Sequence, residues 1–226
     1  MSTVRPSDPA TPASFDLIVN GRAVTARGVA PTTTLLAWLR ATGLTGSKEG
    51  CAEGDCGACS VALVDRDAAG RPTYRTFNSC IALLPMFAGR ELVTVEGLAQ
   101  CGADKKELHP VQAALVEHYG SQCGYCTPGF AVSMFEAYYR DGCKDPAQIS
   151  EQLAGNLCRC TGYRPIRDAA VAVLNERSSR RQTAGASGLT TAATHPDPFA
   201  ARLQAPLLPP QALNYSAGDA KFFRPT

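Results

Sequence analysis

Eight of the ten cysteines in this chain fall into two groups of four. In the first group Cys51, Cys56 and Cys59 follow the spacing C-x4-C-x2-C, and Cys80 comes further along the chain. Short loops use this spacing to hold a 2Fe–2S cluster, whose two irons need four thiolate ligands. The first group therefore indicates electron transfer.

The second group consists of two close pairs. Gly-Tyr separates Cys123 from Cys126, and a single arginine separates Cys158 from Cys160. The pairs can form one four-thiolate site only if the intervening chain folds back on itself. Two clusters in one chain imply an electron relay.

Glycines lie among the ligands of the first group, at Gly50, Gly54 and Gly57. Glycine adopts positive φ values at little cost, so a loop rich in it can curl around the inorganic sulfides and bring backbone amides close to them. Amide donors of this kind tune the reduction potential of a cluster.

The elements around the first group read as a small mixed sheet with one helix. Asn20-Gly21 favours a type I′ turn between two strands, and apolar residues from Thr33 to Thr42 recur at helical spacing. Strands are predicted over 15–19, 22–25, 60–64, 74–78 and 92–95. This order resembles the β-grasp arrangement of plant-type ferredoxins.

From Pro110 onward the pattern changes to helices. Four are predicted, each with proline in its first turn, over 110–119, 128–140, 146–154 and 165–177. Both cysteine pairs then lie at helix starts, whose positive ends favour a cluster of net negative charge. The expected fold is α+β, with a β-grasp 2Fe–2S domain followed by a four-helix-bundle 2Fe–2S domain.

Composition narrows the possible functions. The net charge is +2 and the two signs are mixed along the chain, so neither a nucleic-acid groove nor a membrane-binding patch is expected. No signal-peptide core or membrane span is visible, and we expect a cytoplasmic protein. Disulfides are rare in that compartment, which leaves metal binding as the better use of the cysteines.

The cysteines have other possible roles. Paired cysteines also hold structural zinc, but the loop of the first group argues for iron. A thioredoxin-like role for Cys123 and Cys126 is disfavoured by the second pair. Cys101 and Cys143 are expected to be small, partly buried residues and not ligands. A Rieske site needs two histidine ligands, whereas the three histidines read as surface or capping residues: His109, His118 and His195.

Two strings of residues carry a family resemblance. Gln122 to Gly129 reads QCGYCTPG, and Gly155 to Pro165 reads GNLCRCTGYRP. Both closely resemble the iron-sulfur module of the molybdenum hydroxylases, the xanthine dehydrogenase and aldehyde oxidase family. The resemblance runs from about Phe15 to Arg177 and is greatest to the small subunit of bacterial xanthine dehydrogenases.

The resemblance implies a path for electrons. They would leave the substrate at a molybdopterin centre in a partner subunit, pass through both 2Fe–2S clusters, and reach FAD and then NAD. The cluster of Cys123, Cys126, Cys158 and Cys160 would face the pterin, with Gln122 and Cys160 touching it. The expected reaction is hypoxanthine and xanthine oxidation in purine catabolism. Two alternatives to this function stay open. The chain could belong to an aldehyde, N-heterocycle or carbon monoxide dehydrogenase, or it could be a free-standing two-cluster ferredoxin.

The same reasoning divides the chain into segments. We expect a flexible N-terminus (1–13), a ferredoxin-like domain (14–100), a helical domain (101–177) and a linker (178–212). Residues 213–226 would begin an FAD-binding domain or form a tail. FAD is therefore expected in a following domain or in a partner, and no residue of this chain is expected to catalyse hydroxylation.

Overall fold

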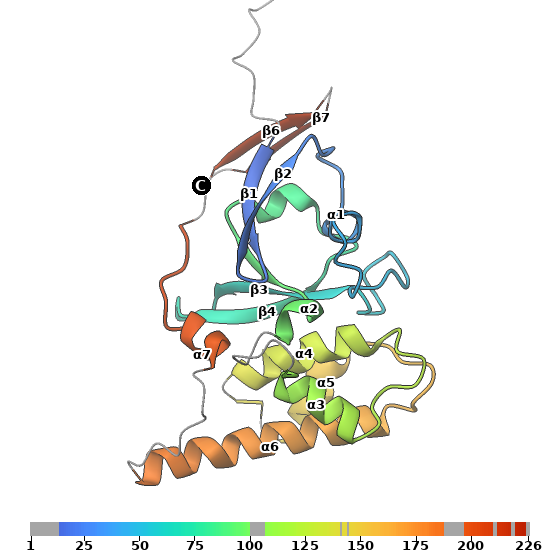
Figure 1. Ribbon diagram of the computed structural model, residues 1–226, viewed down its shortest axis with the longest axis vertical. Coiled ribbons are helices and arrows are strands. Elements are labelled where there is room, and N and C mark those ends of the chain that lie inside the picture. The colour runs from blue at the N-terminus through green and yellow to red at the C-terminus, as the bar shows by residue number, and fades with distance from the viewer. Residues whose placement is uncertain are drawn as a thin grey trace, which may run out of the picture.

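The computed structural model describes residues 14–99, 107–140, 142–143, 145–187, 197–209, 212–217 and 220–224, and only the backbone of 180–187 and 216–217. The fold is α+β, as predicted, with a curved sheet above a group of helices (Figure 1). Within the described part of the chain no helix is long and apolar enough to cross a membrane.

Five strands form the main sheet in the order β2-β1-β5-β3-β4. The strands are β1 (Ser14–Val19), β2 (Arg22–Arg27), β3 (Ser60–Arg66), β4 (Pro72–Asn78) and β5 (Glu91–Val93). β1 pairs with β5 in parallel, and the other pairs are antiparallel. The predicted hairpin between β1 and β2 is confirmed, with Asn20 and Gly21 both at positive φ.

Helix α1 (Leu35–Ala41) crosses one face of this sheet, and the 3-10 helix η1 (Leu84–Phe87) lies beside it. The hydroxyl of Thr34 caps α1 by accepting the amide of Ala37 at 3.2 Å. Leu35 and Leu39 of the helix pack into the same buried cluster as Leu17, Leu63 and Leu92 of the sheet.

The last predicted strand is shorter than expected. β5 ends at Val93, and Val95 begins the short helix α2 (Val95–Leu98). The reason is a side-chain contact at Thr94, whose amide donates to Asn20 Oδ1 at 2.8 Å while its hydroxyl accepts from Asn20 Nδ2 at 2.9 Å. The asparagine of the hairpin turn thus takes the place of a further strand residue.

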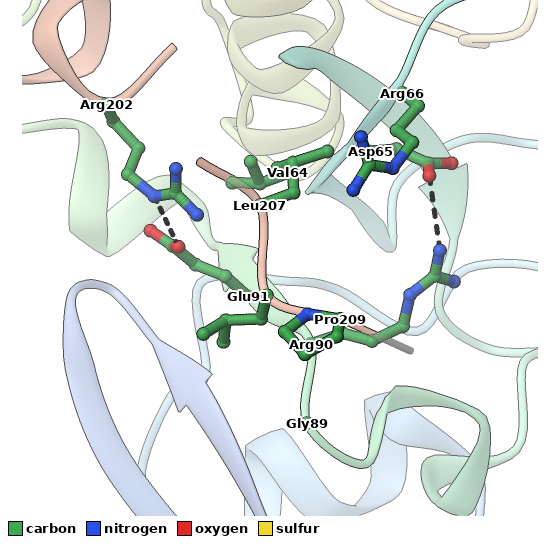
Figure 2. A pocket seen from close by; sticks show the side chains of 10 residues that line it. Val64, Asp65, Arg66, Gly89, Arg90, Glu91, Arg202, Leu207 and Pro209 are labelled. Carbon is green, nitrogen blue, oxygen red and sulfur yellow. Dashed lines mark hydrogen bonds and ion pairs between the residues drawn. The ribbon is translucent and has the colours of Figure 1, made fainter. Parts of the chain in front are cut away.

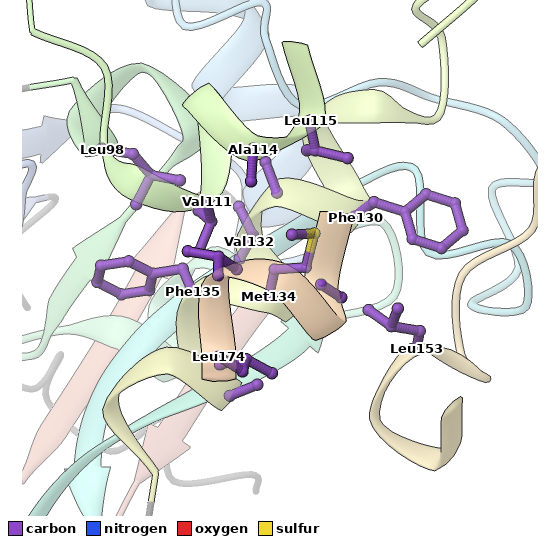
Figure 3. Packing of buried hydrophobic residues seen from close by; sticks show 14 of the residues in the cluster. Leu98, Val111, Ala114, Leu115, Phe130, Val132, Met134, Phe135, Leu153 and Leu174 are labelled. Carbon is purple, nitrogen blue, oxygen red and sulfur yellow. The ribbon is translucent and has the colours of Figure 1, made fainter. Parts of the chain in front are cut away.

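The predicted four-helix group is present. It consists of α3 (Pro110–Glu117), α4 (Thr127–Tyr139), α5 (Pro146–Leu153) and α6 (Arg164–Ser187). Side chains from all four helices meet in one apolar cluster, and Figure 3 shows Met134 near its centre. α6 contributes residues spaced three and four apart, the period of one helix face: Ile166, Ala169, Ala170, Val173 and Leu174.

Helix α4 joins the two halves of the molecule. It packs against β3 and β4, and Ala62, Val64 and Tyr74 of those strands belong to the helical cluster. The Tyr74 and Phe135 rings lie 4.6 Å apart. Glu136 Oε2 also accepts the amide of Thr76 at 2.8 Å, so the helix is fixed to the sheet by polar as well as apolar contacts.

The segment predicted to be a linker has more structure than expected. α6 continues to Ser187, and residues 178–187 contain no proline that would end the helix. Helix α7 (Pro198–Arg202) follows, and its buried Phe199 packs against Phe135 with ring centroids 4.9 Å apart. Phe199 thus docks part of the segment that was predicted to be a linker.

Beyond α7 the chain runs along the sheet. Arg202 forms an ion pair with Glu91 at 2.6 Å, and Figure 2 shows Leu207 and Pro209 covering a shallow pocket beside Arg90. The boundary expected near residue 100, and Cys101 with it, lies outside the described residues.

The described part of residues 213–226, which are predicted to begin an FAD-binding domain or form a tail, packs on the first domain. Strands β6 (Leu213–Ala217) and β7 (Ala220–Arg224) form a hairpin beside β1 and β2 (Figure 1). Tyr215 is fully buried and meets Phe15 edge-on at 5.1 Å. Arg224 donates to the carbonyls of Met86 and Ala88 at 2.6 and 2.5 Å.

His109 is an unexpected part of the core. It caps α3, as the sequence suggested, by accepting the amide of Val111 at 3.3 Å, but it is fully buried and not at the surface. Rings from α4 and α7 cover it, and its Nε2 lies 3.0 Å from the Tyr139 hydroxyl. Burial lowers the pKa of His109 to about 4.

Replacing Phe199 by alanine should lower the free energy of unfolding by about 3 kcal/mol, since it removes a buried ring. Denaturant unfolding of the cluster-loaded chain measures this loss. Phe223→Ala is the matched control, because that ring is 71% exposed and its loss should have little effect. Equal effects of the two substitutions would contradict the docking of α7.

Acidification should weaken the fold through His109. The unfolded chain takes up this proton near pH 6.5 and the folded chain only near 4, so stability is lost as the pH falls between these values. From pH 7 to 5 the loss is about 2 kcal/mol. Urea unfolding at several pH values should show it in the wild type and show a flatter dependence in His109→Gln; parallel curves would contradict the assignment.

Candidate iron-sulfur centres

The first three cysteines lie on a loop that leads into β3. The amides of Asp55 and Cys56 point at the sulfur of Cys51, at 3.3 and 3.4 Å. Gly50 is required by close approach, because a Cβ there would lie 2.7 Å from the Cys56 sulfur. The loop therefore curls around its own thiols, as the glycine pattern predicted.

Cys80 reaches the loop from just beyond the end of β4. The side-chain Nδ2 of Asn78 donates to the Gly54 carbonyl, and the Ser79 hydroxyl donates to the Cys59 carbonyl at 2.7 Å. Cys59 and Cys80 are both buried and hydrogen-bonded to each other. The two residues that precede the fourth cysteine thus attach the end of β4 to the loop.

Two thiols of this site, Cys51 and Cys80, have pKa values shifted in opposite directions. In the pair of Cys51 and Cys56, the backbone amide of Glu53 is the main cause that lowers the pKa of Cys51 to about 6. In the pair of Cys59 and Cys80, burial and the neighbouring Cys59 raise the pKa of Cys80 to about 12. Four thiolates would repel one another here unless cations lay between them.

The second site is built at the starts of two helices. Cys126 is the N-cap residue of α4, and Cys123 lies in the turn before it. Cys158 and Cys160 occupy the loop that ends where α6 begins. The side chains of Cys123 and Cys160 are hydrogen-bonded, as are those of Cys126 and Cys158. The fold therefore brings together the two pairs that lie far apart in sequence.

At the second site the pKa values of the two thiols in each pair are shifted in opposite directions. Burial and Cys158 raise the pKa of Cys126 to about 12. Although burial opposes it, the hydroxyl and amide of Thr161 lower the pKa of Cys158. The amide of Tyr125 lowers the pKa of Cys123, and hydrogen bonding to Cys123 raises that of Cys160. A metal ion bound here would displace the protons of these thiols.

The donor set fits a binuclear cluster. Among the described residues no three histidine, cysteine or acidic side chains are placed to hold a single metal ion. A 2Fe–2S cluster instead takes two thiolates at each iron, which is how the thiols pair at both sites. Sulfur donors alone also suit Fe–S clusters, whereas a Rieske centre requires histidines.

Three residues at the second site were not singled out from the sequence, although all three lie in the second quoted string, 155–165. The Tyr163 hydroxyl accepts the amide of Cys158 at 3.0 Å, and the Thr161 hydroxyl lies 3.1 Å from its sulfur. Asn156 is buried between the two sites. Gln122, Cys123 and Cys160 are exposed, so one end of this site opens to the surface. The spare Cys143 is buried and is not paired with either set of thiols.

Two family descriptions match this chain. Residues 17–84 match a 2Fe-2S iron-sulfur cluster binding domain, and residues 94–171 match a [2Fe-2S] binding domain. Each match contains one of the two groups of four cysteines.

Curated relatives of known name are similar over the same region. Xanthine dehydrogenase 1 of Arabidopsis thaliana is 48% identical over 157 residues, which are 68% of this chain and 11% of that protein. Aldehyde oxidase 1 of Cavia porcellus is 44% identical over 161 residues, or 70% of this chain and 12% of that protein. The chain thus spans about a tenth of the length of these relatives.

Solved structures extend the likeness. An aldehyde oxidoreductase from Desulfovibrio desulfuricans has a TM-score of 0.63 and 34% identity, covering 74% of this chain and 17% of that one. A chain of quinoline 2-oxidoreductase from Pseudomonas putida 86 has a TM-score of 0.60 and 32% identity, covering 74% of this chain and 96% of that one. This chain therefore belongs to the xanthine dehydrogenase and aldehyde oxidase family of molybdenum hydroxylases, as an iron-sulfur module with two 2Fe–2S-binding domains.

Proposed function

We propose that the two groups of cysteines hold one 2Fe–2S cluster each. Cys51, Cys56, Cys59 and Cys80 would bind the first, and Cys123, Cys126, Cys158 and Cys160 the second. The observation that carries this assignment is the pairing of the thiols, which at both sites supplies two donors for each of two irons. A bound cluster would supply a one-electron acceptor at each site.

The chain's own residues would tune these centres. At the first site the amides of Asp55 and Cys56 already point at a ligand sulfur, and such donors favour the more negative, reduced form. At the second site the Thr161 hydroxyl and the N-terminus of α4 do the same. Burial of Cys59 and Cys80 keeps water from half of the first site.

The module would relay electrons between two partners. The exposed end of the second site, with Gln122 and Cys160, would face a molybdopterin-binding large subunit, and these two residues would contact the pterin. The first site would pass the electrons to FAD, bound in a following domain or another subunit, and then to NAD. The substrates would be hypoxanthine and xanthine. Similarity to aldehyde oxidoreductase and quinoline 2-oxidoreductase keeps aldehydes and N-heterocycles as alternatives.

Purification of the tagged chain from its own host tests this role. We expect it to bring molybdenum-containing and FAD-containing polypeptides in fixed ratio, and the complex to reduce NAD with hypoxanthine or xanthine. Activity with an aldehyde or a quinoline, and none with hypoxanthine or xanthine, would contradict the proposed substrates and support that alternative. A chain that purifies alone with both clusters would be a free-standing ferredoxin, and the relay to fixed partners would be wrong.

Cysteine substitutions should damage the two centres separately. The reconstituted chain should hold two clusters, that is about four irons and four sulfides. Cys56→Ser should remove only the first centre and Cys126→Ser only the second, because different elements build them. Iron analysis and electron paramagnetic resonance (EPR) at low temperature measure these losses. Cys143→Ser is the control, and loss of either centre in it would refute the ligand assignment.

Gln122→Ala should leave both clusters formed but weaken the contact with the pterin. Loss of one buried hydrogen bond costs about 1 kcal/mol, or roughly fivefold in affinity. Pterin occupancy and the rate of cluster reduction by substrate, at matched iron content, should fall accordingly. If pterin occupancy and the rate of cluster reduction both stay at wild-type values, Gln122 does not contact the pterin. The assignment of the cluster ligands would be unaffected.

A further inference from the structure

The two cysteine sites are joined by a short bridge of hydrogen bonds. The amide of Leu157 donates to the carbonyl of Cys56 at 2.9 Å. Cys56 belongs to the first site, and Leu157 directly precedes Cys158 of the second. The backbone therefore links a proposed ligand of one cluster to a proposed ligand of the other through a single hydrogen bond.

The side chain of Asn156 holds this bridge in place. Its Nδ2 donates to the Gly57 carbonyl at 3.1 Å, and its Oδ1 accepts the Ser133 hydroxyl of α4 at 2.6 Å. Asn156 is only 4% exposed, and Ser133 is buried as well. A buried amide with both ends satisfied strongly resists movement, because any shift leaves a polar group unpaired.

The backbone is packed closely on both sides of that amide. A Cβ at Gly57 would overlap the Gly155 carbonyl and the Asn156 amide, and a Cβ at Gly129 would overlap the Gly57 carbonyl. Gly57 is in addition at φ +68°. These two positions need glycine because the loop of the first site lies directly on α4 and on the loop of the second.

We propose that Asn156 is a positioning residue that sets the electronic coupling between the two centres. It would do so by keeping the Leu157 to Cys56 hydrogen bond and the contact of Gly57 with α4. This inference rests on the proposed function. The step concerned would make and break no bond: one electron would pass from the second centre to the first, after entering the second from the partner that holds the molybdopterin and before leaving the first for the flavin.

Coupling depends steeply on separation. Electron tunnelling falls exponentially with distance, and the magnetic dipole interaction between two reduced clusters falls with its cube. A bridge that opens by a small amount would therefore slow transfer between the centres while leaving each cluster and its ligands unchanged. A side chain with a merely stabilising role would alter neither quantity in the folded protein.

Three variants of the full chain test the proposal. Asn156→Ala removes the bridging amide, and Gly129→Ala pushes the Gly57 carbonyl away from α4. Gly155→Ala is the matched control, since a Cβ there meets no atom within 4 Å. Iron content and EPR of each cluster establish loading. The magnetic splitting between the reduced clusters, and the rate of transfer after rapid photoreduction, then report the coupling.

We expect both test variants to keep two cluster signals, to lose the splitting and to transfer electrons several times more slowly, with the control like the wild type. Normal signals with unchanged splitting in Asn156→Ala would overturn the role of Asn156 alone. If Gly129→Ala does not fold, Asn156→Ala decides the matter. Absence of one signal from the wild type would instead overturn the ligand assignment, and this inference with it.

Discussion

The packing of helix α4 is the constraint on which the rest of the structure depends. Its N-cap is Cys126, its body fills the centre of the helical core, and its outer face lies on β3 and β4. Those strands are connected to the loops that carry the first group of cysteines. A movement of α4 would therefore change both sites at once, and the large buried area of this contact makes such a movement costly.

A second constraint is electrostatic. Each site gathers four thiols, and burial raises the pKa of Cys80 and of Cys126, so the protein by itself disfavours the thiolate form at these two positions. Amide and hydroxyl donors stabilise some of the negative charge, and the remainder requires iron. Cluster binding and folding of these loops should thus be linked.

The C-terminal segments add stability at two places that the cysteines do not touch. Phe199 fills the space among Tyr74, Phe135 and His109, and Tyr215 fills the open end of the first core beside Phe15. In the sequence, both aromatic residues are flanked mainly by polar or small residues. The return of the chain across the sheet therefore ties the end of the helical group to the first domain.

The sequence by itself determined what is local. The Asn20-Gly21 turn and proline at helix starts predicted the hairpin and the four helices, because these depend on residues close in the chain, while the cysteine spacing indicated two groups of four thiols. The family strings pointed to the right module for the same reason. The docking of Phe199 and the burial of His109 depend on partners more than twenty residues away. Only the tertiary structure decided these two features. It also decided the contact among Gly57, Gly129 and Asn156, because a close approach of backbone segments leaves no periodic signal in the sequence.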